Sequence, residues 1–296
     1  MPTGDDVELR GHVCLFCNGH FPLLRARLPG LSGMRSGSTG GGKMETTATR
    51  RGSRAAAAAT VAIVALLAFA TGASAAPPLV PQSFGTLGGP GGGPNGITDD
   101  GVMGGTSAVA SGRPHAFVTS GDSMIDLGTL GGSSSIVTAM NNNGRVVGFS
   151  QTSTGPTHAF ISDGNGLVDL GTLGGTLSQA LAVNDQDQVA GMSTGSGTPP
   201  HAFLWTAGTM IDLGTLGGAS SFANAINERG QIVGSAATAT GPSHAVLWAK
   251  GTTTDLGVLP GATSSGAIAI SNSGQVAGTS SRGSHIDTVR WSADKA

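Results

Sequence analysis

One eight-residue stretch recurs along this chain at a fixed distance. Its clearest copy is Ile211 to Gly218, Ile-Asp-Leu-Gly-Thr-Leu-Gly-Gly, and close copies begin at Ile125, Val168 and Thr254. A partial copy runs from Ser83 to Gly89. The first glycines of the copies are spaced by 43 residues: Gly85, Gly128, Gly171, Gly214 and Gly257. A fixed period of this length indicates structural repeats, each of which buries its apolar face only against its neighbours.

Composition agrees with a β protein rich in turns. The chain has 51 Gly, no Tyr and only 11% charged residues. The repeats occupy residues 79–296, where 7 basic residues stand against 13 acidic ones, a net charge of −6. An acidic surface without basic clusters argues against nucleic acid and anionic membranes as partners. Both cysteines, Cys14 and Cys17, lie upstream, so the repeat domain has no disulfide and no thiol chemistry.

Within one repeat, the first two strands are expected to form a hairpin. Ser221 to Asn227 and Gln231 to Ser235 are short β-prone runs joined by an Asn-Glu-Arg-Gly turn. The last turn position favours a left-handed backbone, and Asp187, which occupies it in one copy, tolerates that conformation better than most residues. The other four copies have glycine there: Gly101, Gly144, Gly230 and Gly274.

The third strand carries a His-Ala-Phe motif or a variant of it. In His201 to Trp205, alternation places His201, Phe203 and Trp205 on one face and Ala202 and Leu204 on the other. The recurring stretch itself supplies the fourth strand. Four short strands in 43 residues are the content of one β-propeller blade.

The two ends of the repeat region are complementary parts of one repeat. The region begins in a fourth strand, Ser83 to Leu87, and ends in a third, His285 to Trp291. We therefore expect an all-β, five-bladed β-propeller closed by pairing of these strands, with inner strands such as Ala223 to Ile226 and outer strands formed by the recurring stretch. The alternative is an open β-solenoid, whose coils are usually shorter.

The residues before the repeats predict export. Arg50, Arg51 and Arg54 precede an apolar run from Ala55 to Ala70 and then Ala73-Ser74-Ala75, the pattern of a secretory signal peptide over residues 44–75. The run is shorter than the roughly 20 residues that span a bilayer, so no stable membrane insertion is expected after cleavage. Gly52-Ser53 after the arginine pair favours the general export route over the twin-arginine route. Residues 1–43 are interpreted as a disordered leader or a start-site artefact.

The order of the motifs resembles a known family of extracellular repeats. His-Ala-Phe, Asp-Leu-Gly-Thr-Leu-Gly-Gly and Ala-Ile-Asn-x-x-Gly-Gln-Ile-Val-Gly recur in that arrangement over residues 83–291 and are similar to the HAF repeats. The departures are local: His285-Ile286-Asp287 replaces the tripeptide, Val258 and Pro260 alter one recurring stretch, and Thr98 replaces an asparagine. The resemblance implies a secreted protein and brings no catalytic residues with it.

Two polar columns could carry chemistry. The histidines His115, His158, His201, His244 and His285 are assigned to one repeat position, and Asp126, Asp169, Asp212 and Asp255 to another, with Ser83 in the first unit. Histidine is a common metal ligand, and carboxylates can bind calcium or act as general acids. However, the third strand is expected to lie away from the axis, and identical carboxylates cannot supply two different pKa values. We expect both columns to be structural.

Other motifs give no support for a cofactor, a metal site or a catalytic set. Gly91 to Gly96 matches a Gly-x-Gly-x-x-Gly phosphate loop, but no helix is expected to follow it. His12, Cys14, Cys17 and His20 offer four zinc ligands within nine residues, without the intervening finger of a zinc site. No nucleophile elbow and no His-Glu-x-x-His motif is present.

The tips of the predicted hairpins are where the repeats differ most. Function on a repetitive scaffold concentrates at such loops. We predict a monomeric, secreted, non-catalytic module that binds glycans or surface proteins, with an extracellular polysaccharide hydrolase or lyase as the alternative. The candidate ligand-binding residues are Asp99, Asp100, Asn142, Asn143, Asp185, Gln186, Glu228 and Arg229, and Asn272 and Ser273 occupy the last tip.

Overall fold

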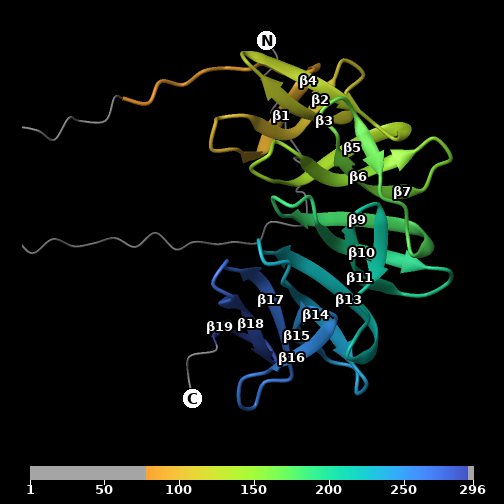
Figure 1. Ribbon diagram of the computed structural model, residues 1–296, viewed down its shortest axis with the longest axis vertical. Helices are drawn as coiled ribbons and strands as arrows, with labels where there is room; N and C mark the ends of the chain where they lie inside the picture. Colours follow the sequence, from red (N-terminus) through yellow and green to blue (C-terminus); the bar gives the residue numbers. More distant parts are fainter. Residues whose placement is uncertain (1–77, 293–296) are drawn as a thin grey trace, which may run out of the picture. The chain divides into compact units, whose positions relative to one another are not determined.

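The computed structural model describes residues 78–292. Contacts divide the chain into two units, Met1–Pro78 and Leu79–Ala296. The predicted leader, the signal peptide and the four candidate zinc ligands His12, Cys14, Cys17 and His20 lie outside the described residues. Within the described part every regular element is a β-strand, in agreement with the expected all-β class (Figure 1).

Each 43-residue repeat folds into one antiparallel sheet whose strands follow the order of the chain. A single parallel bridge between Thr157 and Leu177 also joins the second sheet to the third. Sheet A comprises β1 (Gly88–Ile97), β2 (Met103–Val109), β3 (Pro114–Ser120) and β4 (Ser123–Gly128). Sheet B comprises β5 (Gly131–Met140), β6 (Val146–Thr152), β7 (Thr157–Ser162) and β8 (Leu167–Asp169). Sheet C comprises β9 (Gly174–Val183), β10 (Val189–Gly195), β11 (Pro200–Thr206) and β12 (Thr209–Asp212).

Sheets D and E complete the row. Sheet D comprises β13 (Gly217–Ile226), β14 (Ile232–Thr238), β15 (Ser243–Ala249) and β16 (Thr252–Gly257). Sheet E has three strands, β17 (Ser264–Ile270), β18 (Val276–Arg282) and β19 (His285–Trp291). Strands of a β-solenoid coil pair with the coils before and after them, whereas these strands pair within their own repeat, so the alternative fold is not the one observed.

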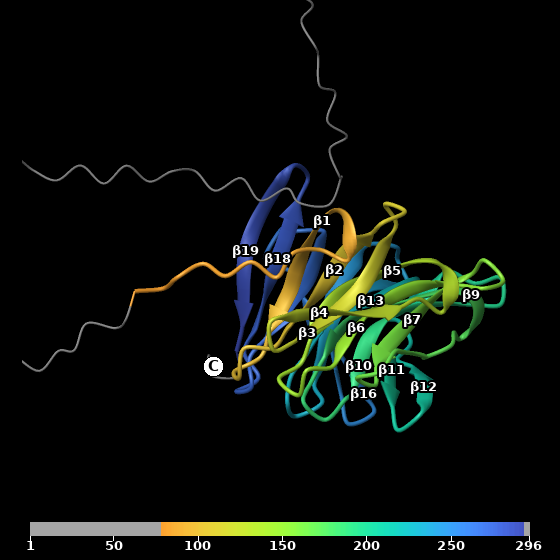
Figure 2. The same cartoon turned by 90° about the horizontal axis from the view of Figure 1, so that it is seen from above.

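The first strands of successive sheets lie against one another, and the fourth strands lie at the far edges. β5 contacts β1 and β9, and β13 contacts β9 and β17. Figure 2 gives the view from above, in which the sheets lie behind one another. The predicted inner strand Ala223 to Ile226 is the second half of β13, as expected. The recurring stretch therefore ends one sheet and begins the next.

The two glycines that close the recurring stretch start the following strand directly, as Gly88, Gly131, Gly174 and Gly217 do for the first four sheets. Gly217 has a φ of 92°, a left-handed conformation that favours glycine. A Cβ on Gly218 would lie 2.5 Å from the carbonyl oxygen of Thr238, so only glycine allows the two backbones to come this close. The Gly-Gly pair thus makes the sharp step from one sheet to the next.

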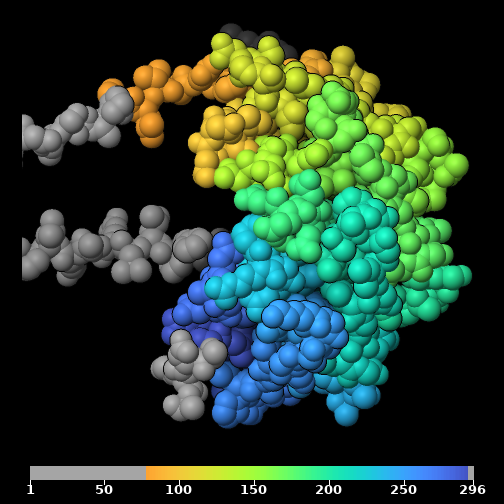
Figure 3. Space-filling view, in the orientation of Figure 1, coloured from red at the N-terminus to blue at the C-terminus, as the bar shows by residue number. Residues whose placement is uncertain are grey.

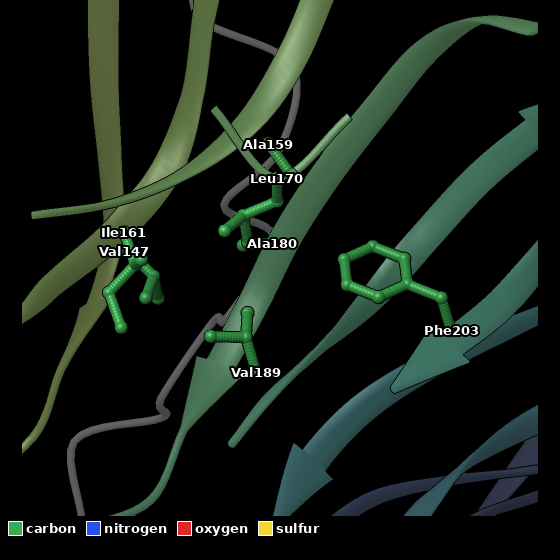
Figure 4. Close-up of a cluster of buried hydrophobic side chains, with 7 residues drawn as sticks. All are labelled: Val147, Ala159, Ile161, Leu170, Ala180, Val189 and Phe203. Atoms are coloured by element: carbon green, nitrogen blue, oxygen red, sulfur yellow. The ribbon is translucent and has the colours of Figure 1, made fainter. Parts of the chain in front are cut away.

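The core lies between neighbouring sheets and follows the predicted alternation. Phe203 and Trp205 pack toward sheet B, whereas Ala202 and Leu204 pack toward sheet D. In Figure 4 the side chains of Val147 and Phe203 point into the space between sheets B and C. The largest buried side chains recur at one position of the third strand: Phe117, Phe160 and Phe203.

The predicted closure of the ring is wrong for this structure. Ser83 to Leu87 forms no strand, and β19 is an edge strand with no fourth strand beside it. Sheet A and sheet E lie at opposite ends of the row of sheets (Figures 1 and 3). The complementary lengths of the two ends therefore do not bring them together.

The outward faces of the end sheets explain why they stay apart. Sheet D turns the apolar side chains of Val233 and Leu247 toward sheet E. The equivalent positions of sheet E hold Ala277 and Arg290, which are paired with each other and exposed. At the other end, β1 has the sequence Gly-Gly-Pro-Gly-Gly-Gly-Pro-Asn-Gly-Ile and offers few apolar side chains. Closure would bury the Arg290 guanidinium, which opposes it, although Ile268 and Ile286 also leave apolar side chains exposed on sheet E.

Among residues 78–292 there is no helix of the length and apolarity needed to cross a bilayer.

Candidate functional site

The first four repeats each hold one histidine of the third strand against one aspartate of the fourth. In every pair the histidine Nδ1 lies 2.8 or 2.9 Å from the aspartate Oδ2. The histidine side chains are 21 to 28% exposed and those of the aspartates 39 to 47%, so each pair stabilises the fold by about 0–1 kcal/mol. The pairs are His115–Asp126, His158–Asp169, His201–Asp212 and His244–Asp255.

Each of these aspartates also fixes the turn that follows it. Its Oδ1 accepts a hydrogen bond from the backbone N–H of the glycine two residues later, at 2.7 or 2.8 Å. The carboxylates are therefore engaged by a histidine and by the backbone in the same way in every sheet that carries the pair, which confirms the predicted structural contacts. A uniform column offers no pair of unlike carboxyl groups for acid–base catalysis.

The fifth histidine does not belong to this column. Asp287 lies opposite Ser280, the place that His244 takes opposite Ala236 in sheet D. His285 lies two residues earlier, opposite Arg282, and its Nε2 is 3.0 Å from Asp287 Oδ1. The assignment of five histidines to one position is wrong in the last repeat, because the strand pairing preserves the 43-residue spacing and His285 departs from it.

The predicted ligand-binding residues lie at the hairpin tips between the first and second strands, where they bond to the tip of the next sheet. The backbone N–H of Asp99 donates to Asn142 Oδ1 at 2.7 Å, and that of Asn142 donates to Asp185 Oδ1 at 2.8 Å. The N–H of Asp185 donates to Glu228 Oε2 at 3.1 Å, and that of Glu228 to Asn272 Oδ1 at 3.0 Å. We call this series the tip ladder. It connects all five sheets.

The other predicted tip residues take part in the same network or in their own turns. Asn143 Nδ2 donates to the carbonyl oxygen of Asp185 at 2.7 Å, and Gln186 Nε2 donates to Glu228 Oε2 at 3.1 Å. Asp100 accepts a hydrogen bond from Thr98, and the N–H of Arg229 donates to Asn227 Oδ1 at 3.0 Å. Many polar atoms of the tips are thus engaged within the protein, which the sequence did not predict.

A row of buried asparagines lies directly before the tips, and its function was missed by the sequence analysis. Asn184 is 1% exposed; its Oδ1 accepts from the N–H groups of Gln186 and Gln188, and its Nδ2 donates to the carbonyl oxygen of Asn227 at 3.1 Å. Asn141 donates to the carbonyl oxygen of Asn184 in the same way, at 2.9 Å. The signal was an asparagine immediately before three of the five turns, at a spacing of 43 residues: Asn141, Asn184 and Asn227.

A column of buried serines, also missed, ties each first strand to the preceding sheet. Ser221 Oγ donates to the carbonyl oxygen of Gly214 at 2.6 Å and accepts from the N–H of Ala202 at 2.8 Å. Three other serines make the same two bonds: Ser135, Ser178 and Ser265. Their spacing of 43 or 44 residues was visible in the sequence, but serine is common enough in this chain to hide it.

One polar pocket breaks the repeat pattern. It lies between the tips of sheets B and C, has a volume of about 340 Å³ and is lined by Asn143, Arg145, Asp163 and Asp187 with two glycines. Arg145 Nε lies 3.5 Å from Asp187 Oδ2, and Arg145 Nη1 donates to the carbonyl oxygen of Ser162 at 2.9 Å. We call it the tip pocket. Of its lining, only Asn143 is among the predicted binding residues, since the turn position accounts for Asp187 and no sequence pattern singles out Arg145 or Asp163.

The left-handed turn at Asp187 is confirmed, with a φ of 59°. Its carboxylate also has a bonding function, since Asp187 Oδ1 accepts from Asn141 Nδ2 at 2.9 Å. In the next two sheets a glutamine supplies that acceptor from within the same turn, as Gln188 Oε1 does for Asn184 Nδ2 at 2.8 Å. Arg145 occupies the glutamine position in sheet B, so the acceptor there comes from sheet C. The tip pocket is formed where Arg145 replaces the glutamine and Asp187 of sheet C provides the acceptor.

Two carboxyl groups at the tips and turns have lowered pKa values. The hydrogen bond from the Thr98 side chain lowers the pKa of Asp100. Bonds from the backbone N–H groups of Asn165 and Gly166 lower the pKa of Asp163, and the nearby Arg145 charge acts in the same direction. A lowered pKa keeps a carboxylate ionised at neutral pH, where it can accept hydrogen bonds but cannot donate a proton as a general acid.

No group of three or more histidine, cysteine, aspartate or glutamate side chains among residues 78–292 is arranged to hold a metal ion. The Gly91 to Gly96 segment, which matches a phosphate loop by sequence, lies within strand β1. In the described part of the chain, a cofactor site is therefore provided neither by a cluster of metal-ligating side chains nor by the Gly91 to Gly96 segment.

Comparisons with known proteins find a distant structural likeness and no match by sequence. No protein-family model matches the chain, and no curated protein matches it. Among solved structures, the β-propeller domain of the Trilobed protease from Pyrococcus furiosus, described as having an open velcro topology, aligns with a TM-score of 0.37 and 12% identity. The alignment covers 53% of this chain and 51% of that one, about half of each. A likeness at this level does not decide the fold, which rests on the strand pairing described above.

Proposed function

We propose that this protein is a secreted, monomeric, non-catalytic binding module of the HAF-repeat type, built as a five-bladed propeller whose ring is open. Its ligands are glycans or proteins of a cell surface. Export rests on the signal-peptide pattern of residues 44–75, and the family on the three motifs that recur in order. The five sheets supply the blades.

The observation that carries the binding proposal is the tip pocket. It combines a guanidinium, two carboxylates and a side-chain amide in about 340 Å³, and Arg145 and Asp187 both depart from the repeat there. Donors and acceptors so close together suit a ligand with several neighbouring hydroxyl or amide groups, because each hydroxyl both donates and accepts. Opposite charges in the pocket disfavour a ligand with a strong net charge of either sign.

Binding is preferred to catalysis on the chemistry of the carboxyl groups. A glycosidase needs one carboxyl group that remains protonated, with a raised pKa, beside a second that is ionised. The resolved shifts at Asp100 and Asp163 are in the opposite direction. Asp185 and Glu228 are acceptors in the tip ladder, and the carboxylates of Asp99 and Asp187 accept from the side-chain amides of Asn142 and Asn141. The polysaccharide-acting enzyme therefore stays the second candidate without an observation in its favour.

A glycan array combined with a screen for polysaccharide degradation tests this proposal. We expect saturable binding to at least one glycan or surface fraction, with no turnover of any substrate. Arg145→Met should weaken that binding about ten- to a hundredfold, since a bond to a charged group is worth about 1.5–3 kcal/mol. Arg113→Met is the matched control, because Arg113 is exposed in the β2–β3 turn, outside the pocket and outside the candidate binding residues. Turnover that Asp185→Asn or Glu228→Gln abolishes would instead establish the enzyme.

A further inference from the structure

Sheet E ends in a strand with an open edge. In sheets A to D the third strand lies between a second and a fourth strand, whereas among residues 78–292 β19 pairs with β18 alone. Along its other edge, backbone N–H and C=O groups are free to pair with an added strand. On the outer face of the same sheet, Ile268 and Ile286 are 59% and 65% exposed. Sheet E therefore offers both an edge and an apolar face to a partner.

A copy of the missing strand stands at the other end of the repeat region. We call residues 79–85 the arm; its residues 80–85 correspond, four repeats earlier, to β16, the fourth strand of sheet D. The arm forms no strand, and its Leu79 and Val80 are at least 81% exposed. Figures 1 and 2 show it as the orange segment that extends away from the sheets. The arm is therefore accessible to another molecule.

The turn after the arm has the geometry of an interior junction. Ser83 Oγ accepts from the N–H of Gly85, and the N–H of Leu87 donates to Ser107 Oγ at 3.1 Å. The corresponding residues after β4 make the same two bonds. The φ of Gly85 is 74°, against 73° for its counterpart Gly128. The arm thus has the position of a fourth strand belonging to a sheet that would precede sheet A.

The arm and β19 depart from the repeat at positions that would face each other. In sheets A to D a histidine of the third strand contacts an aspartate of the fourth. β19 has Asp287 at the histidine position, and the arm has Ser83 at the aspartate position. Two carboxylates would repel each other there, whereas a serine hydroxyl can donate to a carboxylate. The two substitutions are therefore complementary.

A second set of positions changes in the same complementary way. Where sheets C and D meet, one residue each from the third strand, the fourth strand and the next sheet's last turn line a common pocket: Leu204, Ile211 and Gly251. Their counterparts on sheet E, on the arm and in the last turn of sheet A are Arg290, Gln82 and Asp122. Gln82 Nε2 donates to Asp122 Oδ1 at 2.7 Å, so these two are neighbours as expected. A junction of this kind would bring a carboxylate to the Arg290 guanidinium.

The proline of the arm is compatible with strand pairing. In sheet C the N–H of Leu213 donates to the carbonyl oxygen of Ala202 at 2.9 Å. Antiparallel pairs alternate between hydrogen-bonded and non-hydrogen-bonded ones, so the N–H of Met210 points away from the third strand. Pro81 occupies the position of Met210 and therefore loses no bond to β19 by lacking an N–H. Gln82 occupies the next position, which is hydrogen-bonded.

We propose that the arm of one copy of this protein adds to β19 of a second copy as the fourth strand of its sheet E. Within one chain the arm and β19 lie at opposite ends of the row, so the partner is another chain (Figures 1 and 3). Each copy offers one arm and one open edge, and the contact therefore repeats head to tail. Desolvation offsets much of the attraction between Arg290 and Asp122, which makes the contact selective and weak. The dilute protein remains the monomer of the proposed function.

Sedimentation velocity of the full chain over a concentration series tests this contact. We expect the average mass of the parent to rise with concentration. Gln82→Pro removes an N–H at a hydrogen-bonded position and should weaken the association about tenfold, because a buried acceptor is left without its donor. Pro81→Thr is the matched control: it lies at the neighbouring position, where sheet D has Thr253, and should not weaken the association. A parent that stays monomeric at every concentration, or equal weakening by both variants, overturns the proposal.

Charge reversal shows whether the contact joins two chains. Asp122→Arg and Arg290→Glu should each weaken the association severalfold, because each places like charges together at the contact. A mixture of the two variant chains should associate as the parent does, since each supplies the charge that the other needs. Circular dichroism checks that both variants are folded, which we expect because both positions are exposed. A mixture that associates no better than either variant alone contradicts the pairing of arm and edge between chains.

Discussion

The junctions inside the row of sheets and the two ends of the row are built differently. At an interior junction a buried serine such as Ser221 ties the first strand to the preceding sheet, and an asparagine such as Asn184 ties its turn to the following one. At the ends, Gly92 stands at the serine position of β1 and Ser271 at the asparagine position of sheet E. The serines therefore follow the junctions between sheets, because only β1 has no preceding sheet and only β1 lacks the serine. The asparagines follow them less closely, since Thr98 takes the asparagine position of sheet A, which has a following sheet.

The largest difference between interior and end should come from the apolar core. Phe203 is fully buried between sheets B and C, and Phe203→Ala should lower the free energy of unfolding by about 3–5 kcal/mol through lost burial and the cavity left behind. Phe84 is half-buried in the segment before β1, and Phe84→Ala should lower the free energy of unfolding by about 1 kcal/mol or less. Urea unfolding followed by circular dichroism measures both. Equal losses would mean that the N-terminal segment is packed as tightly as the interior.

Replacing a buried serine at an interior junction should lower the free energy of unfolding more than replacing a serine at the end of the row, with smaller losses than for the phenylalanines. Ser221→Ala leaves the N–H of Ala202 and the carbonyl of Gly214 without their buried partner, which should cost about 1–3 kcal/mol. Ser83→Ala is the matched control: it removes an exposed bond to the N–H of Gly85 and should change stability by about 0.5 kcal/mol or less. If Ser221→Ala is as mild as its control in the same unfolding assay, the serine column is not a structural tie.

Replacing the exposed charge of Arg290 on sheet E should change self-association of the protein rather than its stability. Arg290→Leu restores the apolar residue that Leu247 provides at the equivalent position of sheet D. The folded chain should keep its unfolding free energy within about 0.5 kcal/mol but associate with itself as its concentration rises. Sedimentation velocity over a concentration series detects this. Thr279→Val on the neighbouring strand is a control for a general increase in apolar surface.

The smallest predicted effect is on pH-dependent stability, and it should be the same in an interior sheet as in an end sheet. Asp163, in sheet B, and Asp100, in end sheet A, both have pKa values lowered by local hydrogen bonds. Each therefore adds stability that is present above its unfolded pKa, about 3.9, and is lost as the pH falls through the lower folded value. Asp163→Asn and Asp100→Asn should each lower the Tm slightly at pH 7, with the difference from the parent vanishing in acid. A larger effect for Asp163 than for Asp100 would show that the tip pocket adds to the local bonds.

Much of the fold follows from the sequence because its signals are local. The hairpin turn at Asp187 and the alternation of His201, Phe203 and Trp205 were predicted correctly, since each depends on residues close together in the chain. The histidine–aspartate contacts were also accessible, because the partners lie 11 residues apart on adjacent strands.

The rest could not be predicted because it depends on how one sheet is placed on the next. The tip ladder joins residues 43 or 44 positions apart, and its bonds require a particular rotation between sheets. The tip pocket brings Arg145 of one repeat to Asp187 of another, a meeting that no single repeat reveals. The open ends could not be predicted from the complementary lengths of the terminal segments, because those lengths say nothing of the Arg290 charge that closure would bury.

Disulfide trapping tests most directly the claim that the two ends of the row do not meet. If Ser83 to Leu87 were the fourth strand of sheet E, Ser83 would lie opposite Val289, as Asp255 lies opposite Val246 in sheet D. In a chain whose only natural cysteines, Cys14 and Cys17, are removed, Ser83→Cys with Val289→Cys should stay reduced under mild oxidation. Ala249→Cys with Thr252→Cys, which are partners in the β15–β16 hairpin, should be oxidised. Rapid and nearly complete formation of an intramolecular disulfide between positions 83 and 289 would contradict the open row of capped sheets.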